Sequence, residues 1–233
     1  MRKEPFVSGN FYHLFNRGVD RRVVFANDRD YSRFLIGLYL FNDALPRDYN
    51  LTRIDLRSLA SYRTQRELLV DILHWCLMPN HFHILVRQHR EKGVSMFMHR
   101  LGTSYTKYFN QKYERSGRLF ETSFKAKSVG RDEYFSHLAA YIPLNVLELY
   151  QPGWKDKGIP HSQTTEAKSF LKGYRWSSFG NYFGQEVIPG LVAQDVFLKI
   201  FGGSLREYEN LVESFFAGGI PPEHEAKLRS YEA

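Results

Sequence analysis

Two histidines in the middle of the chain stand one residue apart, in the run His81-Phe82-His83. Successive side chains of a β-strand point to opposite faces, so on a strand both imidazoles share one face and Phe82 points to the other. Two imidazoles about 7 Å apart along a strand can converge on one divalent cation. The pattern indicates a metal site, although two ordinary surface or core histidines fit so short a motif equally well.

A third metal ligand could come from a segment further along the chain, Tyr141-Ile142-Pro143-Leu144-Asn145. Tyr141 and Asn145 are four residues apart, so on a helix they share one face, and His137 extends that face by one turn. If this face packs over the histidine strand, the Asn145 carbonyl could complete the metal site, with Tyr141 beside it. Spacing alone does not select Tyr141 over other tyrosines, such as Tyr134, Tyr105 and Tyr12.

The elements that must position these side chains follow from periodicity and turn signals. Strand-forming or alternating runs predict strands over 11–15, 68–78, 81–87 and 122–129. Helical spacing of apolar residues predicts helices over 28–42, 94–113 and 131–147. This order is β-α-β-β-α-β followed by a further helix, the plan of a ferredoxin-like antiparallel sheet. We therefore predict an α+β fold of this kind with an added catalytic helix.

A boundary is expected at Pro152-Gly153, because these two residues break regular structure. We predict a first domain over residues 1–150 and a C-terminal extension over 151–233. The extension combines prolines, glycines and short helical segments, so we expect it to be mostly helical and to lie against the core.

The charge of the chain favours an anionic partner. The formal net charge is +7, and between residues 91 and 130 eight lysines and arginines face three acidic residues. Aromatic side chains, Tyr105 and Phe109 among them, alternate with these cations. Cations that hold phosphates beside rings that stack on bases suit single-stranded nucleic acid, while a solvated helix face over an aromatic core is the alternative.

Composition excludes several classes of protein. The longest uninterrupted apolar run, 34–41, has eight residues, whereas a membrane-spanning helix needs about 20. The single cysteine, Cys76, can build neither an internal disulfide nor a thiolate metal cluster. No glycine-rich phosphate loop or nucleophile-elbow serine motif is found. We expect a cytoplasmic protein that does not bind membranes.

The motifs together resemble a known family. His81-Phe82-His83 resembles the histidine–hydrophobic–histidine (HUH) signature of single-strand DNA endonucleases, and residues 78–86 resemble the form found in REP-associated tyrosine transposases and related single-tyrosine insertion-sequence transposases. The segment 141–145 is similar to the tyrosine motif of that family. Further matches, in family order over about residues 8–180, are Asn16-Arg17-Gly18, Gly117 with Phe120, Phe124-Lys125, and Trp176-Ser177-Ser178.

The resemblance implies a role for each matching residue. His81 and His83 would bind Mg²⁺ or Mn²⁺ with Asn145 as third ligand, and Tyr141 would be the nucleophile. DNA contacts are expected from Arg17, Arg118, Lys125 and Lys127. The chain departs from the family pattern at Val146, where a proline is usual, at Pro143 inside the motif, and at Ser123, where relatives often have arginine.

The implied activity is a DNA transposase reaction on single-stranded hairpin or palindromic repeat DNA, with nicking and joining through a 5′-phosphotyrosine intermediate. The insertion-sequence relatives pair as dimers, and the sequence leaves a homodimer open. The main alternative is a non-catalytic hairpin DNA- or RNA-binding protein of the same fold, since a sheet with basic and aromatic residues also describes an RNA-recognition domain.

Overall fold

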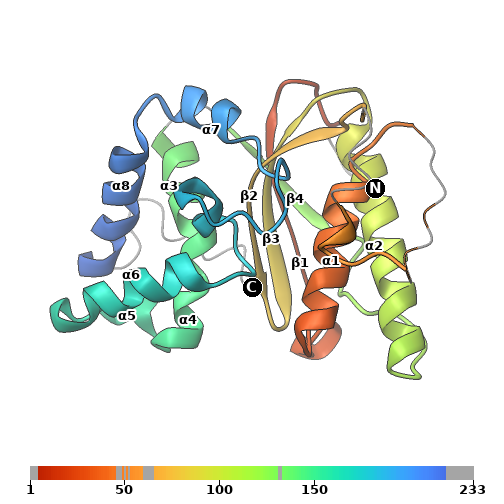
Figure 1. Cartoon of the computed structure of the whole chain (residues 1–233), viewed down its shortest axis with the longest axis horizontal. Coiled ribbons are helices and arrows are strands. Elements are labelled where there is room, and N and C mark those ends of the chain that lie inside the picture. Colours follow the sequence, from red (N-terminus) through yellow and green to blue (C-terminus); the bar gives the residue numbers. More distant parts are fainter. Residues whose placement is uncertain are drawn as a thin grey trace.

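The computed structural model describes residues 5–45, 49, 51, 53–59, 66–130 and 133–218. One antiparallel sheet lies at its centre, with helices on both faces (Figure 1). The strands are β1 (Phe11–Arg17), β2 (Val70–Met78), β3 (His81–Gln88) and β4 (Lys125–Val129). The helices up to residue 144 are α1 (Asp28–Leu40), α2 (Gly93–Lys112) and α3 (Glu133–Leu144). Those that follow are α4 (Leu147–Tyr150), α5 (Trp154–Lys157), α6 (Thr164–Gly173), α7 (Gln194–Phe201) and α8 (Leu205–Gly218).

The strand order β2-β3-β1-β4 with antiparallel neighbours confirms the predicted ferredoxin-like α+β fold. The added helix α3 and the helical C-terminal part are both present. Strand β1 runs two residues further than expected, and β4 begins three residues later. Helix α3 ends at Leu144, one residue after Pro143, and a separate helix begins at Leu147.

Each face of the sheet packs against a different set of helices. Helices α1 and α2 cover one face, where the ring centroids of Phe34 and Phe82 lie 5.0 Å apart. Helix α3 and the C-terminal helices cover the other, where Phe11 meets Phe135 at 5.2 Å. Because both faces are covered, β2 is buried along its whole length and reads as an apolar run with little alternation.

The register of the sheet decides which side chains share a face. Phe15 stands opposite His83, and Arg17 stands opposite His81. Directly opposed residues of an antiparallel pair lie on the same face, so both histidines face α3 and the C-terminal helices. We call this side of the sheet the histidine face.

The β2–β3 turn at Pro79-Asn80 is tied to the segment that follows β1. The Pro79 carbonyl accepts hydrogen bonds from the backbone N–H groups of Val24 and Phe25, at 2.8 and 3.0 Å. The Asn80 carbonyl accepts from the N–H of Gly18 at 2.8 Å. These bonds hold the start of β3, and therefore His81, against the end of β1.

The C-terminal part is joined to β2 by backbone hydrogen bonds. The N–H of Leu77 donates to the Trp176 carbonyl, and the N–H of Ser178 donates to the Trp75 carbonyl, each at 2.9 Å. Trp176 also stacks on Tyr31 of α1 at 4.8 Å. The part of the chain after residue 150 is therefore hydrogen-bonded to β2, the edge strand of the sheet in the first part. Among the described helices, none is long and apolar enough to cross a membrane.

A buried histidine outside the histidine pair makes the fold sensitive to acid. His74 on β2 is fully buried against Tyr182, Phe197 and Tyr208, and burial lowers its pKa to about 3. Below pH 6.5 the unfolded chain gains a proton at His74 that the folded chain does not bind, so the folded state loses stability as the pH falls from 6.5 towards 3.

We expect His74 to lower the free energy of unfolding by about 2 kcal/mol between pH 7 and pH 5. In His74→Phe this part of the pH dependence should disappear, whatever the change in stability at pH 7. Urea denaturation at several pH values measures it, with the exposed His99→Phe as control. An unchanged slope in His74→Phe would show that His74 is not held neutral by the fold.

Candidate active site on the histidine face

His81 and His83 lie at the start of β3 with ring centroids 5.0 Å apart and planes nearly perpendicular. His81 Nδ1 lies 2.6 Å from Asn80 Oδ1, so Nδ1 carries the proton and Nε2 carries the lone pair. His83 Nδ1 lies 2.9 Å from Nε2 of His13 on β1. His83 Nε2 is buried and has no hydrogen-bond partner among the described residues. His81 therefore offers Nε2 to an electrophile, and His83 offers Nε2 in the tautomer whose Nδ1 donates to His13.

Burial keeps these imidazoles neutral. It lowers the pKa of His13 and that of His81 to about 3, and that of His83 well below its ordinary value. Arg17 and Lys155 contribute a smaller lowering at His81 and His83, because a nearby positive charge disfavours a second one. The pair is therefore near the cations Arg17 and Lys155 while carrying no charge itself at neutral pH.

A small cavity of about 10 Å³ opens beside the two histidines, enough for roughly one water molecule. Arg17 and Lys125 line it together with His81 and His83. Lys125 also pairs with Glu121 at 3.7 Å. Lys127 stands opposite His13 in the register and therefore lies on the same face of the sheet.

Arg118 lies away from the other predicted DNA contacts. It lines a separate, larger cavity beside α2, with Lys107 and Phe124 among its neighbours. The structure thus brings Arg17, Lys125 and Lys127 to the histidine face but leaves Arg118 apart from them.

Tyr141 lies on α3, which packs across β2 and β3. Its side chain is 0% exposed. The Lys155 ammonium lies 5.2 Å from the centre of its ring. Tyr134 on the same helix is buried too, so burial does not distinguish the two tyrosines.

Asn145 directly follows α3 and is buried. Its side-chain Nδ2 donates to the carbonyls of Tyr141 and Ile142, at 3.0 and 3.2 Å. The last carbonyls of a helix lack partners inside the helix, and this side chain satisfies two of them. Nδ2 is thus committed to the helix end, and Oδ1 accepts from the Lys155 ammonium at 3.2 Å.

Lys155 of α5 joins these groups. Its ammonium bonds Asn145, lies over Tyr141, and is close enough to His81 and His83 to lower their pKa values. Lys155 therefore links the Asn145 amide oxygen and the Tyr141 ring by contact, and the two imidazoles through its charge, on the side of the sheet where α3 packs against β3. Such a cluster can bind a phosphate group and polarise it.

Two members of the cluster were missed by sequence reasoning. His13 lies on the predicted first strand, but only the pairing of that strand with β3 shows its contact with His83. Lys155 lies in the part expected to be an extension, ten residues after Asn145, and no local pattern marks it. Among the described residues, no three His, Cys, Asp or Glu side chains form a metal-binding group.

These features define an α+β protein with a histidine pair and several cations on one face of its sheet. The helix that carries Tyr141 packs on the same face. Residues 52–145 match the family described as IS200-like transposases. This match covers less than half of the chain, but it includes His81, His83, Tyr141 and Asn145. It confirms the resemblance to IS200-like transposases over that segment.

A solved structure of a REP-associated tyrosine transposase bound to a REP hairpin is also similar to the chain. The TM-score is 0.46 at 12% sequence identity, over 81% of this chain and 88% of that one. No curated protein sequence matches the chain.

Pro143 leaves a free acceptor inside α3. Proline has no N–H, so the Ala139 carbonyl one turn earlier cannot receive the usual helical bond. The hydroxyl of Tyr208 on α8 donates to this carbonyl at 3.1 Å. A residue of the C-terminal part thereby supports the helix that carries Tyr141.

We expect Tyr208→Phe to lower the free energy of unfolding by about 1–3 kcal/mol, because it leaves the buried Ala139 carbonyl without a donor. Denaturant unfolding measures this change. Tyr150→Phe is the matched control, since the Tyr150 hydroxyl makes no hydrogen bond within the described part of the chain, and it should be nearly neutral. Equal effects of both substitutions would contradict this role of Tyr208.

Proposed function

We propose that this protein is a metal-dependent single-stranded DNA endonuclease and strand transferase that acts on hairpin or palindromic repeat DNA. The observation that carries the proposal is the meeting of α3 with the histidine face, which puts the Tyr141 helix next to His81 and His83. All three residues fall within the segment that matches IS200-like transposases.

The side chains fit a divalent cation in part. The lone pairs on Nε2 of His81 and His83 are suitable ligands, and Asn145 Oδ1 would add a hard oxygen of the kind that Mg²⁺ or Mn²⁺ takes. Lys155 now holds that oxygen, so a third ligand requires its ammonium to move. A bound metal would act as a Lewis acid on the scissile phosphate and help to orient it.

The reaction is a transesterification in which the Tyr141 oxygen attacks the scissile phosphorus. The new bond joins the phenolic oxygen to the 5′-phosphate, and the bond from phosphorus to the 3′ oxygen breaks. The phenolic proton passes to water, and the leaving 3′ oxygen takes up a proton. Attack of another 3′-OH on the phosphotyrosine reverses these steps and joins strands, so no nucleotide cofactor is consumed.

Lys155 supplies a permanent positive charge beside the nucleophile. A cation near a tyrosine favours its ionised form, and the same charge stabilises the negative charge that builds up on the phosphate. We propose that the ammonium passes from Asn145 Oδ1 to a phosphate oxygen when the strand enters. Since Tyr141 is fully buried, entry of the strand must displace side chains that cover it, the Lys155 ammonium among them.

The path of the DNA follows the cations of the histidine face. Arg17, Lys125 and Lys127, which lie on this face, would contact phosphates next to the scissile one. Arg118 lies beside α2 and would contact a more distant part of the nucleic acid. A homodimer is compatible with this arrangement but is not required by it.

The second candidate function is hairpin binding without cleavage. It is favoured by one observation, namely that the buried Tyr141 and the Lys155–Asn145 bond leave the nucleophile and the third ligand engaged. The two functions differ in whether a covalent protein–DNA adduct forms.

We expect single-stranded hairpin DNA from the repeats flanking the gene to form a covalent adduct with the protein in Mn²⁺ or Mg²⁺ and none in EDTA. Tyr141→Phe should abolish the adduct on a denaturing gel while hairpin binding persists. Tyr134→Phe, on the same helix, is the control and should retain it. Binding without an adduct in any metal would reject the enzyme and support the hairpin-binding alternative.

Lys155→Gln should slow adduct formation by about 10²–10³-fold, the usual loss when one charged stabilising group is removed from an active site. Lys155→Arg should restore part of the rate, because it keeps the charge. Single-turnover kinetics measure both. The exposed Lys157 on the same short helix provides the control Lys157→Gln, and a similar slowing in that variant would leave Lys155 without a specific role.

A further inference from the structure

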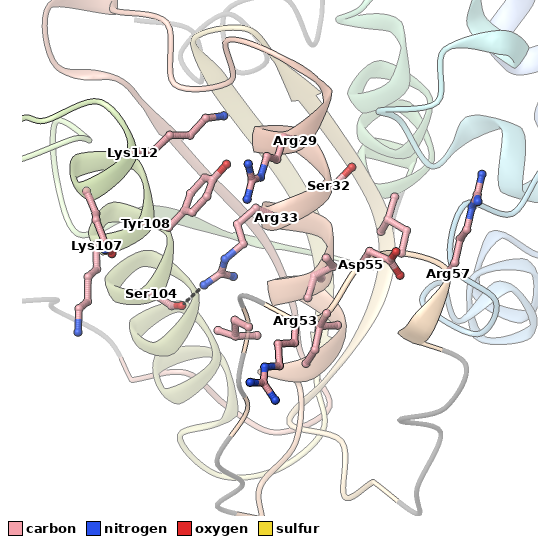
Figure 2. A pocket seen from close by; sticks show the side chains of 15 residues that line it. Arg29, Ser32, Arg33, Arg53, Asp55, Arg57, Ser104, Lys107, Tyr108 and Lys112 are labelled. Carbon is pink, nitrogen blue, oxygen red and sulfur yellow. Dashed lines mark hydrogen bonds between the residues drawn. The ribbon is translucent and has the colours of Figure 1, made fainter.

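A large cavity lies on the other side of the sheet from the histidines. Its volume is about 990 Å³, and α1, α2, Leu51 and residues 53–57 line it. Figure 2 shows Arg29, Arg33 and Tyr108 in the space between the two helices. We call it the α1–α2 pocket. None of the residues assigned to strand transfer lines it.

The α1–α2 pocket is strongly basic. It is lined by six cationic side chains, namely Arg29, Arg33, Arg53, Arg57, Lys107 and Lys112, and by one carboxylate, Asp55. Lys112 is paired with Asp30 at 2.5 Å. The other five form no ion pair with any described residue. Asp55 Oδ1 already accepts from the N–H of Ser58 at 2.7 Å, within its own turn.

Arg33 is the least hydrated of these cations. It is half-buried, and its guanidinium donates to the Ser104 hydroxyl at 2.9 Å, the bond drawn in Figure 2. The guanidinium also lies 5.4 Å from the centre of the Tyr108 ring. Burial lowers the pKa of Arg33. A guanidinium withdrawn from water with only neutral partners retains donors that suit a multivalent oxyanion such as phosphate.

Apolar side chains form the remaining wall. Ile36 of α1 and Ile54 are buried there, and Leu51 and Leu56 are partly exposed to the cavity. Inorganic phosphate is far smaller than about 990 Å³ and makes no favourable contact with an apolar wall. A cavity of this size suits a ligand with an apolar ring as well as a charged group.

We propose that the α1–α2 pocket binds a nucleotide, with its phosphate on Arg33 and the neighbouring cations and its base against the apolar wall. The nucleotide is either free in solution or an unpaired residue of a DNA hairpin. This site goes beyond strand transfer, because the sheet separates it from Tyr141 and the histidine pair.

The test titrates the full-length protein with each of the four deoxynucleoside 5′-monophosphates, with deoxyadenosine and with inorganic phosphate, by calorimetry. At least one monophosphate should bind saturably and more tightly than either part alone. Arg33→Gln should weaken its binding about tenfold or more, as expected for loss of a charge-assisted hydrogen bond. Arg206→Gln on α8 is the control and should bind as the wild type.

A second variant keeps the proposal testable if Arg33→Gln fails to fold. Lys107 is exposed on α2, so Lys107→Gln should keep the melting temperature and still weaken binding by about threefold. A fluorescent hairpin with an unpaired loop and a blunt duplex without one identify the source of the nucleotide. If Arg33→Gln weakens binding of the hairpin but not of the duplex, the nucleotide belongs to DNA. If the hairpin does not compete with the monophosphate for binding, the ligand is a free nucleotide.

Two results would overturn the proposal. One is that no monophosphate binds saturably, or that Arg33→Gln and Lys107→Gln leave such binding unchanged. The other is equal dependence of hairpin and blunt duplex on Arg33, which would reduce the pocket to a phosphate-backbone contact. Adduct formation at Tyr141 is scored separately, so failure of this proposal leaves the strand-transfer proposal standing, and the reverse also holds.

Discussion

The pairing of β1 with β3 is the constraint on which the candidate site depends. It sets Phe15 against His83 and Arg17 against His81, and it brings His13 within hydrogen-bond distance of His83. A slip of one residue would turn both histidines towards α1 and α2. The hydrogen bonds from the N–H groups of Val24, Phe25 and Gly18 to the β2–β3 turn oppose such a slip. Backbone hydrogen bonds therefore determine which face of the sheet carries the histidines.

The C-terminal part belongs to the site as well as to the fold. Tyr208 satisfies the carbonyl that Pro143 leaves free, and Lys155 holds Asn145 and covers Tyr141. These contacts explain how a proline can be kept inside the helix that carries the proposed nucleophile. They also mean that a chain cut at residue 150 would lose the cation nearest to Tyr141.

The sequence was sufficient for the sheet, the order of its elements and the shared face of His81 and His83, because periodicity and turn residues are local signals. It could not predict the contact of His13 with His83 or the position of Lys155, which depend on pairing and packing between segments far apart in the chain. The sequence shows Pro143 inside the tyrosine motif, and its missing N–H implies one lost helical bond. The donor that satisfies the free Ala139 carbonyl, the Tyr208 hydroxyl, lies 65 residues after Pro143 in the sequence.

The most direct test of the central claim is to identify the residue that carries the DNA. The adduct formed with hairpin DNA and Mn²⁺ is digested with nuclease and trypsin, and the modified peptide is sequenced by mass spectrometry. The proposed mechanism predicts a nucleotide 5′-phosphate on Tyr141. A nucleotide on Tyr134 or on any other residue would contradict the assignment of the nucleophile and the site built around it.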